Sequence, residues 1–166
     1  INYAENILRN PSDQIAIEEF RETGTQKKLS RKELKEKALR MAGWLRSKGV
    51  KRGDRVCAYM PNCSETIITM LATTSLGGIF SSCSSDFGAA GVIDRFEQIE
   101  PKILVAANGY FYNGKLIERM SEIETISKSL STVEEILIFD YVESENNSRS
   151  FTNFETVYLS TPIENF

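Results

Sequence analysis

Four short apolar runs recur through the middle of the chain, spaced by roughly 24 to 32 residues, the length of a strand with its crossover helix. They are RVCAYM (55–60), IFSSCS (79–84), KILVAAN (102–108) and EEILIFDY (134–141). In KILVAA and EILIF the apolar residues follow one another without alternation, which is typical of parallel strands buried on both faces. The pattern predicts an α/β fold, a parallel sheet with crossover helices on both faces.

The helix before the first run has a readable start. In LSRKEL, Ser30 stands at the N-cap and Glu33 three positions later, the spacing of a capping box. Leu29 and Leu34 occupy the positions of a hydrophobic staple around them. Apolar residues at helical spacing continue from there, and Gly49 is placed to end the helix.

Three further helices are expected along the rest of the chain. One starts within PNCSE (61–65) with Asn62 as a candidate cap, one covers 89–99, and one covers 116–130. Nearer the N-terminus, IAIEEFRETGTQKKLS predicts a hairpin that turns at Thr23–Gly24.

We expect residues 1–166 to form a single α/β unit. It divides into an N-terminal segment with the hairpin (1–29), parallel βα units (30–141), and a polar loop with a short terminal element (142–166).

Composition narrows the class of protein. Hydrophobic residues make up 41% and charged residues 26% of the chain, the ordinary balance of a globular domain. No apolar run reaches the roughly 18 residues of a membrane span, so we expect no span and a cytosolic protein. Three cysteines without a signal peptide are expected to be reduced, and the absence of histidine excludes Ser–His and Cys–His nucleophile pairs.

Basic residues are concentrated in one part of the chain. Between Arg21 and Arg55 there are thirteen Lys and Arg against four Asp and Glu, a local net charge of +9, whereas the whole chain carries −3. Such a stretch can bind a nucleic acid or an anionic cofactor, or it can be the solvated face of one helix. The solvated helix face is favoured, because no aromatic residues interleave with these charges before Trp44.

Candidate chemistry lies where strands end, since ligands of an open parallel sheet collect at the carboxyl ends of its strands. The stretch SSCSSDFGAAGV (81–92) leaves a predicted strand and enters a predicted helix. Its small residues let a ligand lie against the backbone, and a helix N-terminus suits an anion. Equally, Ser85 or Asp86 could simply cap the helix while glycine and alanine permit tight packing.

A second candidate loop is NGYFYNGK (108–115), which follows the third strand. Its two Asn-Gly steps predict tight turns, its three aromatic residues offer stacking surface, and Lys115 offers a positive charge. The alternative is a surface hairpin whose aromatic residues pack inward. No carboxylate pair in the chain has a spacing that identifies a glycosidase or metal site.

Several motifs together resemble the N-terminal part of the adenylate-forming acyl-CoA synthetases. They are LSRKEL, GVKRGDRV, TSLGGIFSSCSSDFG and GVIDRFEQIEPKIL, and the resemblance covers nearly the whole chain. The stretch from Ser81 to Lys115 is its most specific part and points to one acid-specific branch of the family. The resemblance implies that this unit belongs to the large N-terminal domain of such an enzyme.

The resemblance also implies a two-step ligase. A carboxylate attacks the α-phosphate of ATP with Mg²⁺, which gives an acyl-adenylate and pyrophosphate, and the CoA thiol then displaces AMP. The family's phosphate loop, which ends in lysine, is missing here, so we expect no catalytic residue and no metal ligand in this chain. The expected partners are the small-molecule substrates and the remainder of the protein's own chain, with no nucleic acid.

The resemblance places two loops on the CoA channel. The candidate CoA-contact residues are Ser84, Ser85, Asp86, Tyr112, Gly114 and Lys115. Lys115 matches in charge a family arginine that meets CoA phosphates, whereas Tyr112 stands where the family has another arginine. Small residues in the CSSDFG turn would let the pantetheine arm pass close to the backbone.

A different class of function remains open from the sequence, a stand-alone α/β binding or interaction module that uses its basic helix. The coding sequence beyond Phe166 separates the two hypotheses. A phosphate loop within a few tens of residues supports the ligase, and a stop codon supports the module.

Overall fold

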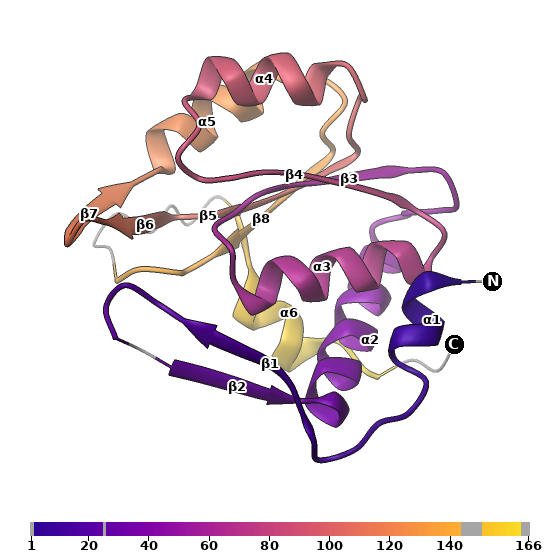
Figure 1. Ribbon diagram of the computed structural model, residues 1–166. Helices are drawn as coiled ribbons and strands as arrows, with labels where there is room; N and C mark the ends of the chain where they lie inside the picture. Colours follow the sequence, from indigo (N-terminus) through magenta and orange to yellow (C-terminus); the bar gives the residue numbers. More distant parts are fainter. Residues whose placement is uncertain (1, 25, 144–150, 164–166) are drawn as a thin grey trace.

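The computed structural model describes residues 2–24, 26–143 and 151–163 (Figure 1). Its centre is a five-stranded sheet in the order β4-β3-β5-β8-β9, in which every neighbouring pair is parallel. The strands are β3 (Arg55–Tyr59), β4 (Ile79–Cys83), β5 (Ile103–Ala107), β8 (Glu135–Phe139) and β9 (Thr152–Asn153). The four apolar runs are thus four strands of one parallel sheet, and the predicted α/β fold is confirmed.

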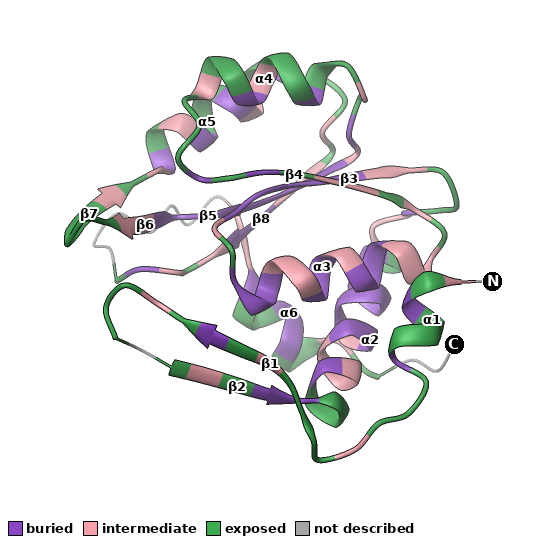
Figure 2. Cartoon of the chain, in the orientation of Figure 1, coloured by how far each residue is buried: buried purple, intermediate pink, exposed green. Residues whose placement is uncertain are grey.

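Helices cover both faces of this sheet (Figure 1). On one face lie α1 (Tyr3–Ile7), α2 (Arg31–Ser47), α3 (Ser64–Ser75) and α6 (Phe154–Ser160); on the other lie α4 (Ala89–Glu97) and α5 (Met120–Ser129). Because side chains alternate along a strand, β3 sends Val56 and Ala58 into the first core and Cys57 and Tyr59 into the second. The two buried cores appear in Figure 2 as purple inner faces of the helices on either side of the purple central strands.

The predicted start of α2 is present in full. The hydroxyl of Ser30 accepts a hydrogen bond from the backbone N–H of Glu33 at 3.2 Å, and the Glu33 carboxylate accepts from the backbone N–H of Ser30 at 2.8 Å. These bonds from Ser30 lower the pKa of Glu33. Leu29 and Leu34 are both buried, as the staple requires.

The start of α3 differs from the prediction. Its N-cap is Cys63, which makes no side-chain cap bond, and Asn62 is exposed and does not cap the helix. Instead the carboxylate of Glu19, on β1 (Ile15–Phe20), accepts from the backbone N–H of Ser64 at 2.8 Å. Burial acts to raise the pKa of Glu19, but hydrogen bonds from Ser64 and Arg21 lower it on balance. A residue distant in sequence therefore closes this helix.

Two hairpins flank the main sheet. The predicted first hairpin pairs β1 with β2 (Gln26–Ser30) in antiparallel register and is confirmed. The second pairs β6 (Gly109–Tyr112) with β7 (Lys115–Glu118), so residues 115–118 are strand and the predicted helix over 116–130 begins only at Met120. Asn113 and Gly114, with φ of 51° and 72°, turn the chain back between β6 and β7.

Two basic residues of α2 bind another part of the fold. Arg40 donates to the carbonyl of Thr161 at 2.7 Å, and the Lys37 ammonium lies 4.4 Å from the centre of the Tyr158 ring. These contacts tie α2 to the α6 end of the chain, so these two charges contribute to packing between elements.

Candidate functional site

The loops that follow β3, β4, β5 and β8 leave the sheet at its carboxyl edge, where the sequence predicts a site. Residues 84–88 follow β4 and lead into α4. The N-cap of α4 is Gly88, and no side chain caps this helix, so neither Ser85 nor Asp86 has the capping role that the sequence also allowed.

Within this turn, the side chains of Ser84 and Asp86 are exposed, whereas Ser85 is only 1% exposed. The carbonyl of Ser85 accepts from the Tyr59 hydroxyl at 3.1 Å and from Nε of Arg119 at 2.9 Å. In the described part of the chain, the Ser85 hydroxyl oxygen is buried without a hydrogen-bond partner. Ser84 and Asp86 therefore expose their side chains at this edge of the sheet, while Ser85 holds the turn to the domain.

Tyr59, at the end of β3, holds the same turn in place. Its hydroxyl also lies 2.7 Å from the carbonyl oxygen of Phe87, so one donor is shared by two carbonyls of the turn. Burial raises the pKa of Tyr59 to about 12, so this hydroxyl stays protonated and donates at neutral pH. The sequence shows Tyr59 only as an apolar strand residue, and nothing in its spacing marks this role.

The other candidate residues lie at the tip of the β6–β7 hairpin. Tyr112 and Lys115 pair across the turn, both are exposed, and the Tyr112 side chain is 67% exposed. Tyr110 and Phe111 are half-buried, so the aromatic residues of this loop divide between packing and surface. The tip therefore presents an aromatic ring and an ammonium group on either side of a tight turn.

The first Asn-Gly step of this loop is not the tight turn that the sequence predicts. Asn108 is fully buried, and its side-chain oxygen accepts from the backbone N–H groups of Tyr141 and Val142 at 2.9 and 3.1 Å. A Cβ on Gly109 would lie 2.7 Å from the carbonyl oxygen of Ile117, so glycine is needed there for close approach of β7. Asn108 therefore joins the segment after β5 to the segment after β8.

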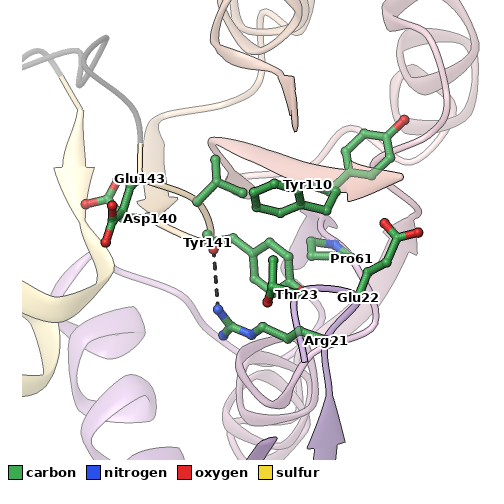
Figure 3. A pocket seen from close by; sticks show the side chains of 10 residues that line it. Arg21, Glu22, Thr23, Pro61, Tyr110, Asp140, Tyr141 and Glu143 are labelled. Atoms are coloured by element: carbon green, nitrogen blue, oxygen red, sulfur yellow. Dashed lines mark hydrogen bonds between the residues drawn. The ribbon is translucent and has the colours of Figure 1, made fainter. Parts of the chain in front are cut away.

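A pocket of about 870 Å³ opens beside these loops, between the turn of the β1–β2 hairpin, β6 and residues 140–143 (Figure 3). Its apolar walls include Pro61, Tyr110, Phe111 and Tyr141, and its charged residues are Arg21, Glu22, Asp140 and Glu143. The Arg21 guanidinium lies 4.1 Å from the centre of the Tyr141 ring and pairs with Glu19 at 2.7 Å. Because Glu19 neutralises the charge of Arg21, the pocket is acidic and does not suit phosphate. None of the six candidate CoA-contact residues lines this pocket.

Metal-binding and membrane-spanning features can be checked over residues 2–24, 26–143 and 151–163. Among these there is no cluster of three or more His, Cys, Asp or Glu side chains that could hold a metal ion. The described helices include none that is long and apolar enough to cross a membrane. All three cysteines are free and buried, and burial raises the pKa of Cys57 to about 12.

The parallel sheet, the helices on both of its faces and the loops at its carboxyl edge make this an α/β domain, and a comparison with family models identifies its family. The model of the AMP-binding enzyme family matches residues 3–162, and the chain belongs to that family. The predicted resemblance to adenylate-forming enzymes is thereby confirmed.

Individual relatives are more specific. The chain is 45% identical over 130 residues to acetoacetyl-coenzyme A synthetase of Rhizobium meliloti (strain 1021). The matched stretch covers 78% of this chain and 20% of that protein. It is 40% identical over 147 residues to acetoacetyl-CoA synthetase of Macaca fascicularis, covering 87% of this chain and 22% of that protein. The solved acetoacetyl-CoA synthetase from Streptomyces lividans superposes with a TM-score of 0.90 at 32% identity, over 98% of this chain and 25% of that one. The chain thus spans about a fifth to a quarter of the length of these relatives.

Proposed function

We propose that this chain is the N-terminal part of an ATP-dependent acid–CoA ligase that converts acetoacetate, ATP and CoA to acetoacetyl-CoA, AMP and pyrophosphate. The observation that carries the proposal is the similarity to acetoacetyl-CoA synthetases over most of the chain, with 45% identity to the R. meliloti protein. The fold supports it, because the S. lividans enzyme has the same arrangement over 98% of this chain.

In the first step a carboxylate oxygen of acetoacetate attacks the α-phosphorus of ATP, and pyrophosphate leaves. In the second step the CoA thiol attacks the acyl carbon of the adenylate, and AMP leaves while the thiol proton is lost. Mg²⁺, when bound, would neutralise charge on the phosphates of ATP. The described residues offer no ligand cluster for that ion, so we assign ATP and Mg²⁺ binding largely to parts of the protein beyond this chain.

The described residues contribute the scaffold and part of the CoA site. We assign Ser84, Ser85, Asp86, Tyr112, Gly114 and Lys115 to the CoA channel. The exposure of Ser84 and Asp86 at the carboxyl end of β4, and of Tyr112 and Lys115 at the hairpin tip, supports this assignment. Lys115 would bind a phosphate at the nucleotide end of CoA, and the small residues of the turn would border the pantetheine arm.

The unit 1–166 would form part of a large N-terminal domain and pack against the remainder of its own chain in the cytosol. It carries no catalytic residue of its own in this proposal.

Substrate preference of the full-length protein tests the function. Pyrophosphate release is measured with ATP, Mg²⁺ and CoA, and with acetoacetate, acetate or propionate as the acid. The proposal expects the highest kcat/KM with acetoacetate. Equal or greater kcat/KM with acetate or propionate would overturn the acid assignment, and no release with any of the acids would overturn the ligase.

A further inference from the structure

Arg119 joins the two loops that carry the candidate CoA contacts. It lies directly after β7 and before α5, and its side chain is 14% exposed. Its Nε donates to the carbonyl of Ser85 at 2.9 Å, and Nη2 donates to the hydroxyl of Tyr110 at 3.1 Å. Its Nη1 pairs with Glu122 at 2.6 Å. One guanidinium thus contacts the 84–88 turn, β6 and α5 at once.

The chemistry of this contact requires arginine. A guanidinium presents several N–H donors in fixed, divergent directions, whereas a lysine ammonium is a single point at the end of a flexible stem. Three acceptors from three different elements surround this group, and the guanidinium carbon lies 5.2 Å from the centre of the Tyr110 ring. A lysine could keep the charge but could not hold all three acceptors.

The β6–β7 hairpin depends on such contacts for its position. Within the described residues it forms a two-stranded sheet of its own, separate from the main sheet, and an isolated two-stranded hairpin is marginally stable. Its base is fastened by the backbone N–H of Arg119, which donates to the carbonyl of Asn108 at 2.8 Å. Its tip is held by the exposed Glu22, whose carboxylate accepts from the backbone N–H of Asn113 at 2.7 Å. The Arg119 side chain links this hairpin to the 84–88 turn through its bonds to Tyr110 and Ser85.

We propose that Arg119 is a positioning residue for CoA: it fixes the 84–88 turn relative to the β6–β7 hairpin and so sets the distance between the two ends of the CoA site. This inference rests on the proposed function, in which the turn borders the pantetheine arm and Lys115 binds a phosphate. CoA is long, and its phosphates lie far from its thiol. Contacts to both ends act together only when the two loops keep one spacing, and small misplacements lower the rate strongly.

The test uses the full-length ligase and three variants. Arg119→Lys keeps the charge but loses the divergent N–H donors of the guanidinium. Tyr110→Phe removes only the hydroxyl that accepts from Arg119. Arg55→Lys is the matched control, because Nε of Arg55 likewise donates to a loop carbonyl, that of Ile99 at 2.7 Å, but at the amino end of β3. For each variant the CoA KM, the ATP–pyrophosphate exchange rate without CoA, and the Tm are measured.

The proposal expects Arg119→Lys to raise the CoA KM about 5- to 50-fold, the effect of losing charge-assisted hydrogen bonds, with a much smaller change in exchange rate. Tyr110→Phe should raise it about two- to fivefold, and the double variant should show less than the product of the two effects. Arg55→Lys should leave the CoA KM at the wild-type value even if it lowers Tm. An unchanged CoA KM in Arg119→Lys, or equal losses in both half-reactions, would overturn the proposal.

Lys115→Ala separates failure of this inference from failure of the proposed CoA site. If Lys115→Ala raises the CoA KM and Arg119→Lys does not, the CoA site stands and the positioning role is wrong. If neither variant changes the CoA KM, the proposed CoA site is wrong, and the positioning role falls with it.

Discussion

Two helices of this fold begin at serine-containing motifs, and their N-termini are closed in different ways. α2 begins within LSRKEL, and Ser30 and Glu33 close its N-terminus with a reciprocal capping box. α4 follows SSCSSDFG, and its N-cap, Gly88, leaves the helix without a side-chain cap. Ser84 and Asp86 of the second motif are exposed, and neither caps this helix.

The difference is the one expected between a structural motif and the CoA-binding motif that we propose. A helix start that its own side chains satisfy has its N-terminal donors occupied, so the LSRKEL motif serves stability. A helix start without a side-chain cap keeps its dipole and N–H groups available to a ligand. The proposed function places CoA at the SSCSSDFG turn, in agreement with this comparison, and four predictions test it, from the largest effect to the smallest.

The largest expected effect is complete loss of ligase activity when residues 1–166 are assayed alone. The family's phosphate loop and its lysine, which would stabilise charge during transfer at the α-phosphate of ATP, are missing from this sequence. The measurement is acetoacetate-dependent AMP formation by the purified chain. Formation above a control without protein would contradict the assignment of the ATP site to the rest of the protein.

On the binding side of the comparison, Lys115→Ala in the full-length ligase should raise the CoA KM between about 1.5-fold and a hundredfold. The lower end corresponds to a solvent-exposed ion contact and the upper end to a desolvated one, and the effect should be largest at low salt. Steady-state kinetics over a range of CoA concentrations measures it. Lys128→Ala, an exposed lysine on α5, is the control and should leave the CoA KM unchanged. Loss of pyrophosphate exchange with an unchanged CoA KM would instead place Lys115 in the first half-reaction.

On the structural side, Ser30→Ala should lower the free energy of unfolding by about 1 kcal/mol, the usual effect of losing an N-cap. Thermal unfolding measures this loss, and the KM values for ATP and CoA should stay near wild type. A several-fold higher KM for ATP or CoA at an unchanged Tm would show that Ser30 acts on a ligand, and the contrast between the two helix starts would then be wrong.

The smallest effect is expected when the α4 start is made to resemble the α2 start. Gly88 has φ of −71° and ψ of 157°, and a Cβ there would meet no atom within 4 Å, so Gly88→Ser fits without strain. The new cap should stabilise the protein by a few tenths of a kcal/mol and compete with a ligand for the helix N-terminus. We expect a higher Tm together with a rise of about twofold in the CoA KM. A higher Tm with tighter CoA binding would count against a role of this helix start.

Local features of the fold could be predicted from the sequence. The capping box of Ser30 and Glu33 lies within four residues, and the apolar runs KILVAA and EILIF show their burial by composition alone. The sequence also placed the CSSDFG turn at the carboxyl edge of the sheet.

Contacts between distant residues could not be predicted in this way. Glu19 closes α3 although it lies 45 residues from Ser64, and Arg119 holds Ser85 across 34 residues. Asn108 reads as a turn residue but fastens two strand exits from a buried position. A single sequence carries no signal for such pairs, because their geometry exists only once the sheet has brought its strand ends together.

Hydrogen–deuterium exchange of the full-length ligase with and without CoA tests most directly whether these two loops form the CoA site. The account predicts that CoA slows amide exchange in peptides covering residues 81–92 and 108–118 and leaves peptides covering 29–36 unchanged. Slower exchange at 29–36, or no change at 81–92 and 108–118 at saturating CoA, would contradict it.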